Sequence, residues 1–134
     1  MNVRKLVLGA IVVVLVAFAL SGLWHTVLMG DFYASAAGDA AREPPLLGSV
    51  FLGYVVVAFI MAYLYPKGYE GGSPVAEGLK FGAIIGLLWW FPTQLVLYGV
   101  MEGPFSLVLV DGGWHVVEEG VAGIALGWIY GRNE

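Results

Sequence analysis

Three long stretches of this chain, 6–29, 44–66 and 81–101, contain no Asp, Glu, Lys or Arg. A helix needs about 20 mainly apolar residues to cross the roughly 30 Å hydrocarbon core of a bilayer. A fourth apolar stretch, 103–131, is interrupted by two adjacent glutamates. Backbone amides cannot stay unpaired in hydrocarbon, and a helix pairs them within one segment, so we expect each stretch to be helical. The pattern predicts an all-α integral membrane protein built as a four-transmembrane-helix antiparallel bundle.

The composition supports a surface that meets lipid. Only 12 % of the residues are charged, whereas soluble domains have about 25 %, and the mean hydropathy is +0.85. The absence of cysteine excludes disulfides and thiolate metal sites. No basic stretch suits nucleic acid, so the lipid bilayer is the expected partner. We expect a single transmembrane domain over 1–134, with spans at about 6–29, 45–65, 78–101 and 107–131.

Basic residues are distributed unevenly about these spans. With four spans, the N-terminus, the 66–80 connection and the C-terminus lie on one side of the membrane. Only Arg42 lies on the other side. Cytoplasmic loops carry an excess of Lys and Arg, so we expect both termini in the cytoplasm and a multi-pass protein of the inner cell membrane. The basic residues on the expected cytoplasmic side are Arg4, Lys5, Lys67, Lys80 and Arg132.

Glycines recur every four residues in the last two expected spans. Residues at this spacing share one helix face, and small residues let helices approach each other closely in lipid. We therefore expect the two stripes to pack against each other, and a homodimer seam is the alternative. The stripes are Gly78, Gly82 and Gly86 in the third span, and Gly123, Gly127 and Gly131 in the fourth.

The polar residues of the fourth span share one helix face. At 100° per residue, His115, Glu118 and Glu119 point the same way. Counted from Asp111 at about 1.5 Å per residue, they lie about 6–12 Å into the outer half of the membrane. Ionisable groups near the middle of a span cost about 2.5–3.5 kcal/mol on insertion scales, so they usually face the bundle interior. Another face is apolar and is expected to meet lipid: Val117, Val121, Ile124 and Trp128.

Two further spans carry polar residues at a similar depth. The first span repeats part of the pattern around His115, because a Gly, a Trp, a His and a Val recur in the same order around His25. In the third span, Gln94 and Tyr98 follow Pro92, which frees backbone carbonyls. We expect His25, Gln94 and Tyr98 to turn toward His115 in the bundle.

This arrangement predicts an intramembrane pocket that binds an ion, a cofactor or a small ligand. Glu118, Glu119, His115 and His25 form its expected core, with Gln94 and Tyr98 lining it. His25, His115 and Glu118 offer two imidazoles and one carboxylate for a metal ion. Two histidines at one depth could instead be axial haem ligands.

Two alternatives use the same residues differently. In a proton-coupled small transporter, Glu118 or Glu119 would carry the proton and nearby aromatic rings would bind apolar cations. In an accessory or assembly subunit of a larger membrane complex, the polar cluster would hold helices together. The sequence does not predict an enzyme with a protein nucleophile, because it has no cysteine, no nucleophile motif and no phosphate-binding glycine loop.

Overall fold

The computed structural model describes residues 2–38 and 41–131, and over these residues it is helical without any strand. Four long helices account for most of the chain, as the apolar stretches predict. The elements in order are α1 (Val3–Gly22), a π-helical segment η1 (Leu23–Leu28), α2 (Gly30–Ala37), α3 (Leu47–Gly68), α4 (Pro74–Val100) and α5 (Phe105–Tyr130).

Three of the helices are long and apolar enough to cross a membrane: α1 continued by η1, α3, and α4. The chain is therefore membrane-compatible over most of its length. The remaining long helix of the described residues, α5, is not apolar enough to be counted with these three. It has the length, but a buried Asp, His and two Glu make it more polar than the others.

Local signals in the sequence explain where the helices begin and end. The side chain of Asn2 accepts a hydrogen bond from the Lys5 backbone N–H at 3.1 Å and caps α1. Ser73 caps α4 in the same way, and Pro74 follows at the first helical position, where its missing N–H is not needed. Gly38 ends α2 with a φ of 51°, a conformation that glycine adopts without strain.

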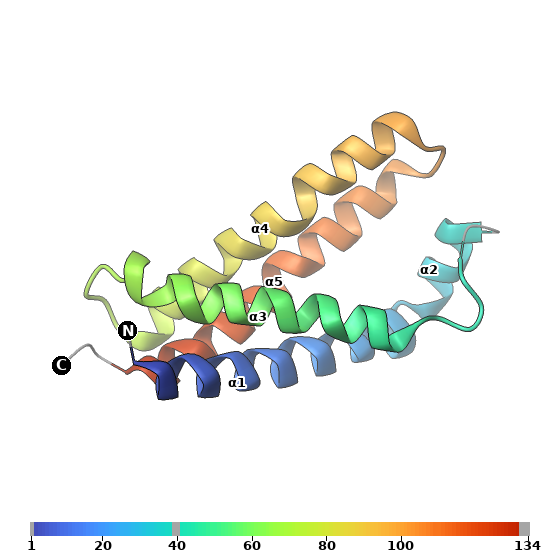
Figure 1. Ribbon diagram of the computed structural model, residues 1–134. Coiled ribbons are helices and arrows are strands. Elements are labelled where there is room, and N and C mark those ends of the chain that lie inside the picture. The colour runs from blue at the N-terminus through green and yellow to red at the C-terminus, as the bar shows by residue number, and fades with distance from the viewer. Residues whose placement is uncertain (1, 39–40, 132–134) are drawn as a thin grey trace.

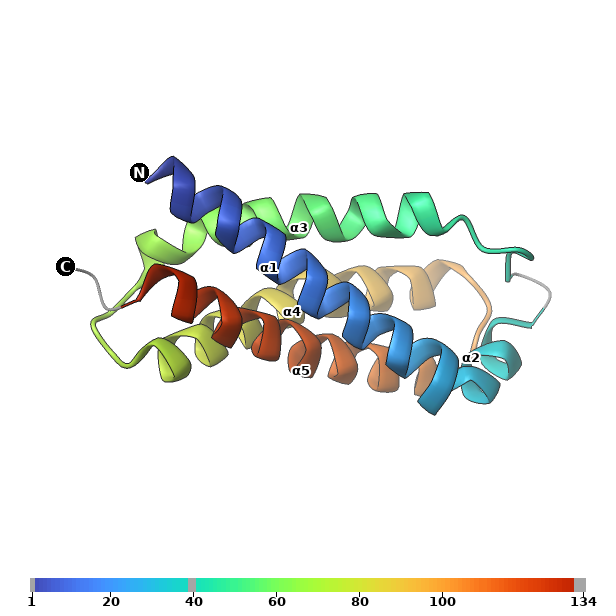
Figure 2. The ribbon, with the colours of Figure 1, turned by 90° about the horizontal axis from the view of Figure 1, so that it is seen from below.

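The helices diverge from one end of the bundle, where α1 and α4 begin and α3 and α5 end. We call this the common end. Figure 1 shows the α3–α4 connection beside the start of α1 and the end of α5, and it shows α2 and the α4–α5 connection at the opposite end. In the view turned by 90°, α1 begins beside the end of α3 and slants away from it to cross over α5 (Figure 2). The main packing partners are α4 with α5, and α1 with both α3 and α5, whereas α3 touches α4 only slightly.

The glycine stripes lie in the seam between α4 and α5. A Cβ on Gly82 would overlap the backbone carbonyl of Glu119, and a Cβ on Gly86 would overlap that of His115. Gly123 and Gly127 are equally close to α4. Gly131 is a correction to the expected stripe: it follows the last turn of α5 with a φ of 68° and meets no neighbour. Its role is to end the helix.

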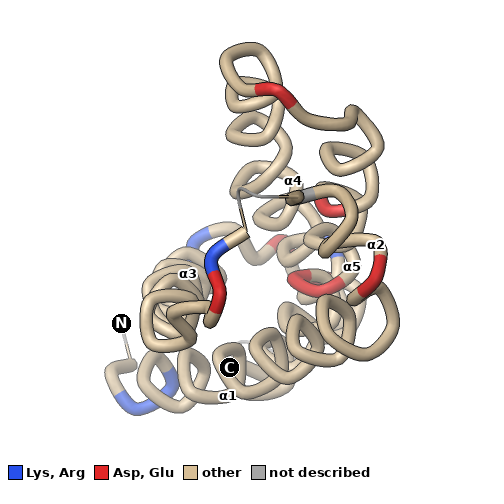
Figure 3. The backbone as a smooth tube through the Cα atoms, turned by 90° about the vertical axis from the view of Figure 1, so that its right-hand side faces the viewer, with Lys and Arg blue, Asp and Glu red and all other residues tan. Residues whose placement is uncertain are grey.

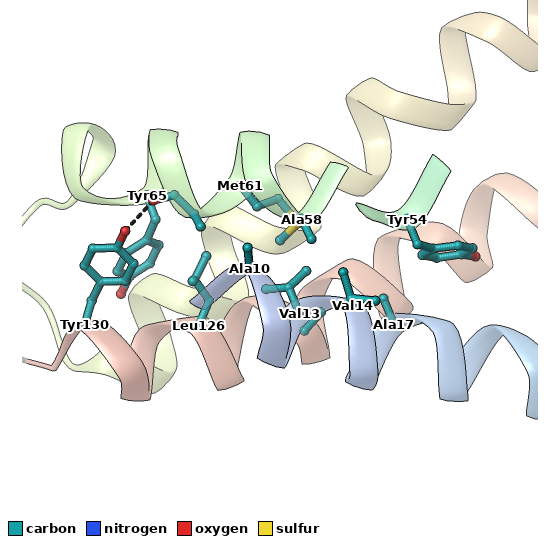
Figure 4. Close-up of a cluster of buried hydrophobic side chains, with 12 residues drawn as sticks. Ala10, Val13, Val14, Ala17, Tyr54, Ala58, Met61, Tyr65, Leu126 and Tyr130 are labelled. Carbon is teal, nitrogen blue, oxygen red and sulfur yellow. Dashed lines mark hydrogen bonds between the residues drawn. The ribbon is translucent and has the colours of Figure 1, made fainter. Parts of the chain in front are cut away.

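An apolar cluster joins α1, α3 and α5 near the common end (Figure 4). Small residues such as Ala10, Ala58 and Ala122 let the three helices approach, and the larger Met61 and Leu126 fill the space between them. Tyr130 donates a hydrogen bond to the Ala62 carbonyl at 2.5 Å. On the other side of α5, Val117, Val121 and Trp128 are exposed, as expected of a lipid-facing surface.

Figure 3 marks the few charged residues along the backbone. Apart from Asp111, Glu118 and Glu119 within α5, the described ones lie in the connections or within two turns of a helix end. At the common end, Lys5 donates a hydrogen bond to the Tyr130 carbonyl at 2.8 Å. A positive charge at this position stabilises the C-terminus of α5, because the last carbonyls of a helix carry partial negative charge. In the α3–α4 connection, Glu70 accepts a hydrogen bond from Lys80. This exposed contact lowers the pKa of the Glu70 carboxyl.

Candidate functional site

Three ionisable side chains meet inside the bundle on one face of α5. Glu118 and Glu119 are 0 % exposed and His115 is 3 % exposed. One donor atom from each of the three lies within 4.8 Å of the others. His115 Nδ1 is 3.6 Å from Glu118 Oε1, as their spacing of one helical turn allows. We refer to these three residues as the acidic cluster.

The acidic cluster contains several polar atoms that have no protein partner. No hydrogen bond within the described residues reaches His115 Nδ1, Glu118 Oε1 or either carboxyl oxygen of Glu119. Buried polar groups are almost always paired, because an unpaired one loses its hydration without compensation. No Lys or Arg in the described part of the chain pairs with either glutamate. The cluster therefore has the chemistry of a site that takes up a cation or protons.

Aromatic rings of α4 enclose the imidazole of His115. The ring centroid of Trp90 is 4.5 Å from that of His115, and the centroid of Trp89 is 4.8 Å away. The glycine seam makes this possible, since Gly86 brings the α4 backbone against the His115 carbonyl. The imidazole is thus fixed between α4 and the interior.

His25 comes from η1 and faces Asp111 on α5. Its Nε2 lies 3.0 Å from Asp111 Oδ1, and its Nδ1 lies 2.9 Å from the Ser21 carbonyl and 3.2 Å from the Ser21 hydroxyl. Both ring nitrogens therefore have partners. The centroids of the His25 and His115 rings are 6.4 Å apart, so the two histidines are neighbours as expected, although each belongs to a different hydrogen-bonded group.

The π-helical turn explains the orientation of His25. In this segment the Met29 N–H bonds to the Trp24 carbonyl five residues earlier, so the register of backbone bonds shifts by one residue. The side chain of Thr26 donates to the Gly22 carbonyl at 2.5 Å, one residue along from the His25–Ser21 contact. π-helical turns of this kind occur frequently at functional sites.

A chain of contacts connects α2 to the acidic cluster. Tyr33 of α2 donates to Asp111 at 2.7 Å, and Trp24 Nε1 donates to the Tyr33 hydroxyl at 3.0 Å. The Trp24 and Trp114 rings stack with centroids 4.3 Å apart and planes within 3°. Trp114 Nε1 then donates to Glu118 Oε2 at 2.6 Å. Burial, and then the bond to Asp111, raise the pKa of the Tyr33 hydroxyl, so it stays a donor at neutral pH.

Gln94 and Tyr98 do not join this group. The contact of Gly86 with His115 sets the register of α4 on α5, and Gln94 lies two turns beyond Gly86. Both residues line a separate hollow of about 260 Å³ near the α4–α5 connection, together with Leu107 and Glu102. The structure therefore does not bring them to the acidic cluster, because equal helical spacing along α4 also moves them outward along its axis.

Two members of the site, Asp111 and Tyr33, were not among the predicted site residues. Asp111 precedes His115 by four residues and so shares its helix face, a signal that the sequence does contain. It was assigned to the membrane surface because of its charge. Tyr33 lies in α2, a short helix that no apolar stretch predicted, so no sequence signal pointed to it.

The structure brings together a different set of possible ligand atoms from the set that the sequence predicts for a metal ion or a haem. The ligand atoms that lie together belong to His115, Glu118 and Glu119, whereas His25 is held by Ser21 and Asp111. Iron of a haem needs a free imidazole nitrogen from each axial histidine. His25 has none in this arrangement, so the geometry favours a single imidazole with two carboxylates over a pair of axial histidines.

Fold and site together define an all-helical, membrane-compatible protein with a buried imidazole–carboxylate cluster. The chain belongs to the DUF1761 family, which is described as proteins of unknown function and whose sequence profile matches residues 8–127. No curated protein and no solved structure matches the chain.

Proposed function

We propose that this protein binds a divalent metal cation inside the membrane, with His115, Glu118 and Glu119 as its ligands. The observation that carries the proposal is the convergence of three buried donor atoms within 4.8 Å of one another. Four of the polar atoms there lack any partner among the described residues. A metal ion would supply a partner for each of them at once.

Charge favours a divalent ion over a monovalent one. Two carboxylates carry two negative charges, and a neutral imidazole adds none. A divalent cation would make the cluster neutral, which matters because a net charge buried in a low-dielectric interior is strongly unfavourable. Asp111 needs no such compensation, since His25 and Tyr33 both contact it.

The ligand types narrow the choice of ion. Imidazole suits Zn²⁺, Fe²⁺ and other transition metals, whereas sites for Mg²⁺ and Ca²⁺ consist of oxygen ligands. One His with two Glu therefore fits a first-row ion such as Zn²⁺, Fe²⁺ or Mn²⁺. Three protein ligands leave a coordination position open, as in zinc sites that also bind a water or a substrate.

The proposal includes a four-span arrangement with α5 as the fourth span. α5 returns antiparallel to α4 after a short connection, and its polar face turns inward while Val117 and Trp128 face outward. With Lys5, Lys67 and Lys80 at the common end, we place that end and both termini in the cytoplasm. The membrane would be the inner cell membrane, and the acidic cluster would lie in its outer half.

A proton-coupled carrier is the second candidate, favoured by one observation. Neither carboxyl oxygen of Glu119 has a hydrogen-bond partner among the described residues, so this group can take up and release a proton without breaking a protein contact. Protons could then neutralise the cluster in place of a metal. An accessory role, as a homo-oligomer or as a subunit of a larger membrane complex, would instead show as stoichiometric copurification.

Metal analysis of the purified protein tests the proposal. We expect about one metal ion per chain after purification in mild detergent, and a high-affinity Zn²⁺ titration after chelation. His115→Ala, Glu118→Gln and Glu119→Gln should each weaken Zn²⁺ binding by more than about 100-fold, beyond the loss typical of residues that only orient a ligand.

Glu102→Gln is the matched control, because it makes the same chemical change at an exposed position far from the cluster. It should leave the titration unchanged. If wild-type protein binds no metal, and proton-driven uptake into liposomes depends on Glu119, the second candidate replaces the first.

A further inference from the structure

A cavity of about 550 Å³ lies beside the acidic cluster and shares only His115 with it. It opens between η1 and α3, where α3 has separated from α4. In Figure 1 the same divergence is visible toward the end at which α2 lies. The volume falls within the range of about 300–1,000 Å³ that is common for small-molecule sites.

Aromatic rings form much of the cavity wall. Tyr54 and Trp89 pack edge to face at 5.5 Å, and Phe18 packs against Tyr54 at 5.8 Å. Trp90 and His115 complete this side. Ring faces and edges at several angles bind another ring well, since offset and edge-to-face pairs are the favoured arrangements.

The wall offers no formal charge to a ligand. Among the residues that line the cavity there is no Asp, Glu, Lys or Arg in the described part of the chain. His25 lines it, but both of its ring nitrogens are engaged by Ser21 and Asp111. A permanently charged ligand would lose its hydration without gaining an ionic partner, which disfavours it.

The exposed part of the cavity wall, its mouth, includes two residues with hydroxyl groups. Thr26 and Ser49 lie there beside Pro45, at the ends of η1 and α3 that face away from the common end. Hydroxyl groups at the mouth can meet a polar atom of a ligand whose rings lie deeper. Because the surrounding helices are apolar enough to span a membrane, such a ligand would arrive from the lipid.

Two glycines keep the cavity open. A Cβ on Gly22 or on Gly53 would meet no atom within 4 Å, and both residues line the space. The absence of side chains at these two positions leaves part of this volume vacant. It also means that a side chain placed at Gly53 would enter the cavity without a steric clash.

From these observations we infer that the cavity binds a neutral, lipid-soluble aromatic molecule with a polar atom at one end. This site shares His115 with the proposed metal site but does not require the metal ion. The aromatic wall selects rings, the lack of charge selects neutral molecules, and the hydroxyls at the mouth orient the polar end.

Photolabelling with benzophenone tests the inference directly. Benzophenone is neutral, aromatic and lipid-soluble, and on illumination it bonds covalently to nearby side chains. Two analogues of similar shape carry a charge: the anion 4-benzoylbenzoate and the cation (4-benzoylbenzyl)trimethylammonium. Each is added to the full-length protein in lipid vesicles, and labelled peptides are identified by mass spectrometry.

We expect saturable benzophenone labelling within residues 18–26 and 45–54, about tenfold above the labelling by either charged analogue. Gly53→Leu should reduce this labelling about tenfold by filling the cavity. Gly48→Leu is the matched control on the same helix, since a side chain there also meets no neighbour but does not line the cavity. It should label like the wild type.

Three outcomes would overturn the inference. Equal labelling of Gly53→Leu and Gly48→Leu would place the probe elsewhere. Preferred labelling by the cationic analogue would assign the cavity to organic cations. Labelling spread over lipid-facing residues of α4, without saturation, would show partition into the bilayer only. Glu119→Gln is expected to retain full labelling, so a failed metal proposal and a failed cavity proposal are distinguishable.

Discussion

The carboxyl group of Glu118 is oriented by Trp114, which donates its indole N–H to Oε2 at 2.6 Å. This bond leaves Oε1 facing His115. Groups that fix a ligand in this way usually change metal affinity by about 10–100-fold when they are removed. Trp114→Phe keeps a ring for stacking on Trp24 but removes the donor, so we predict weaker Zn²⁺ binding within that range, measured by competition with a chelating dye.

Trp128→Phe provides the comparison, because Trp128 lies on the same helix and is 66 % exposed. Its Zn²⁺ affinity should equal that of the wild type. If Trp114→Phe binds Zn²⁺ normally, Trp114 does not position Glu118, and the short bond in the structure has no role in binding.

The sequence was sufficient to predict which polar residues of α5 are buried, but not which residues contact them. Helical spacing predicted that His115, Glu118 and Glu119 share a face, and the cost of an isolated charge predicted that this face turns inward. Helical spacing could not predict that His25 would contact Asp111. The contact involves η1, where the register of backbone hydrogen bonds shifts by one residue. Such a shift leaves no periodic pattern in the sequence.

Close contact between α4 and α5 depends on the absence of side chains at three positions of α4. A Cβ on Gly82 would overlap the Glu119 carbonyl, and backbone atoms cannot move aside as a flexible side chain can. We therefore predict that Gly82→Ala destabilises the protein by about 1–3 kcal/mol, the usual cost of overpacking. Thermal unfolding in detergent, followed by circular dichroism, measures this.

Gly99→Ala is the control within α4, because a Cβ there meets nothing. It should be neutral or stabilise the helix slightly, since Ala favours helix over Gly by up to about 1 kcal/mol. Equal stability of the two variants would mean that α4 and α5 are further apart than the structure places them.

The short helix α2 is held to the rest of the chain by Tyr33, whose hydroxyl contacts both Asp111 and Trp24. A hydrogen bond to a charged group contributes about 1.5–3 kcal/mol. Tyr33→Phe should therefore loosen α2, and we predict faster amide hydrogen exchange over Gly30–Ala37 with little change in α3. Ser35→Ala, an exposed substitution in the same helix, should exchange like the wild type.

The whole molecule combines a tightly packed end with an open one. At the common end, small residues allow the helices to pack closely. Toward the other end, α3 separates from α4. The cavity lies in this region, next to the acidic cluster. Hydropathy predicted the long helices because hydrocarbon imposes a single solution on each segment. It could not predict the divergence, which depends on how side chains of different helices fit together.

The membrane arrangement itself gives the broadest prediction, and the absence of cysteine makes it simple to test. If α4 and α5 both cross the bilayer with the common end in the cytoplasm, Glu102 in the α4–α5 connection faces outward and Glu70 in the α3–α4 connection faces inward. A membrane-impermeant maleimide should then label Glu102→Cys in intact cells. Glu70→Cys should be labelled only after the cells are opened.

A fluorescent protein fused after residue 134 completes the test of α5. It should fluoresce, because such fusions mature in the cytoplasm, whereas alkaline phosphatase at the same position should be inactive. The reverse result would mean that α5 does not cross. His115 and the two glutamates would then approach the membrane surface, where water could solvate them, and the charge argument for a metal ion would lose its basis.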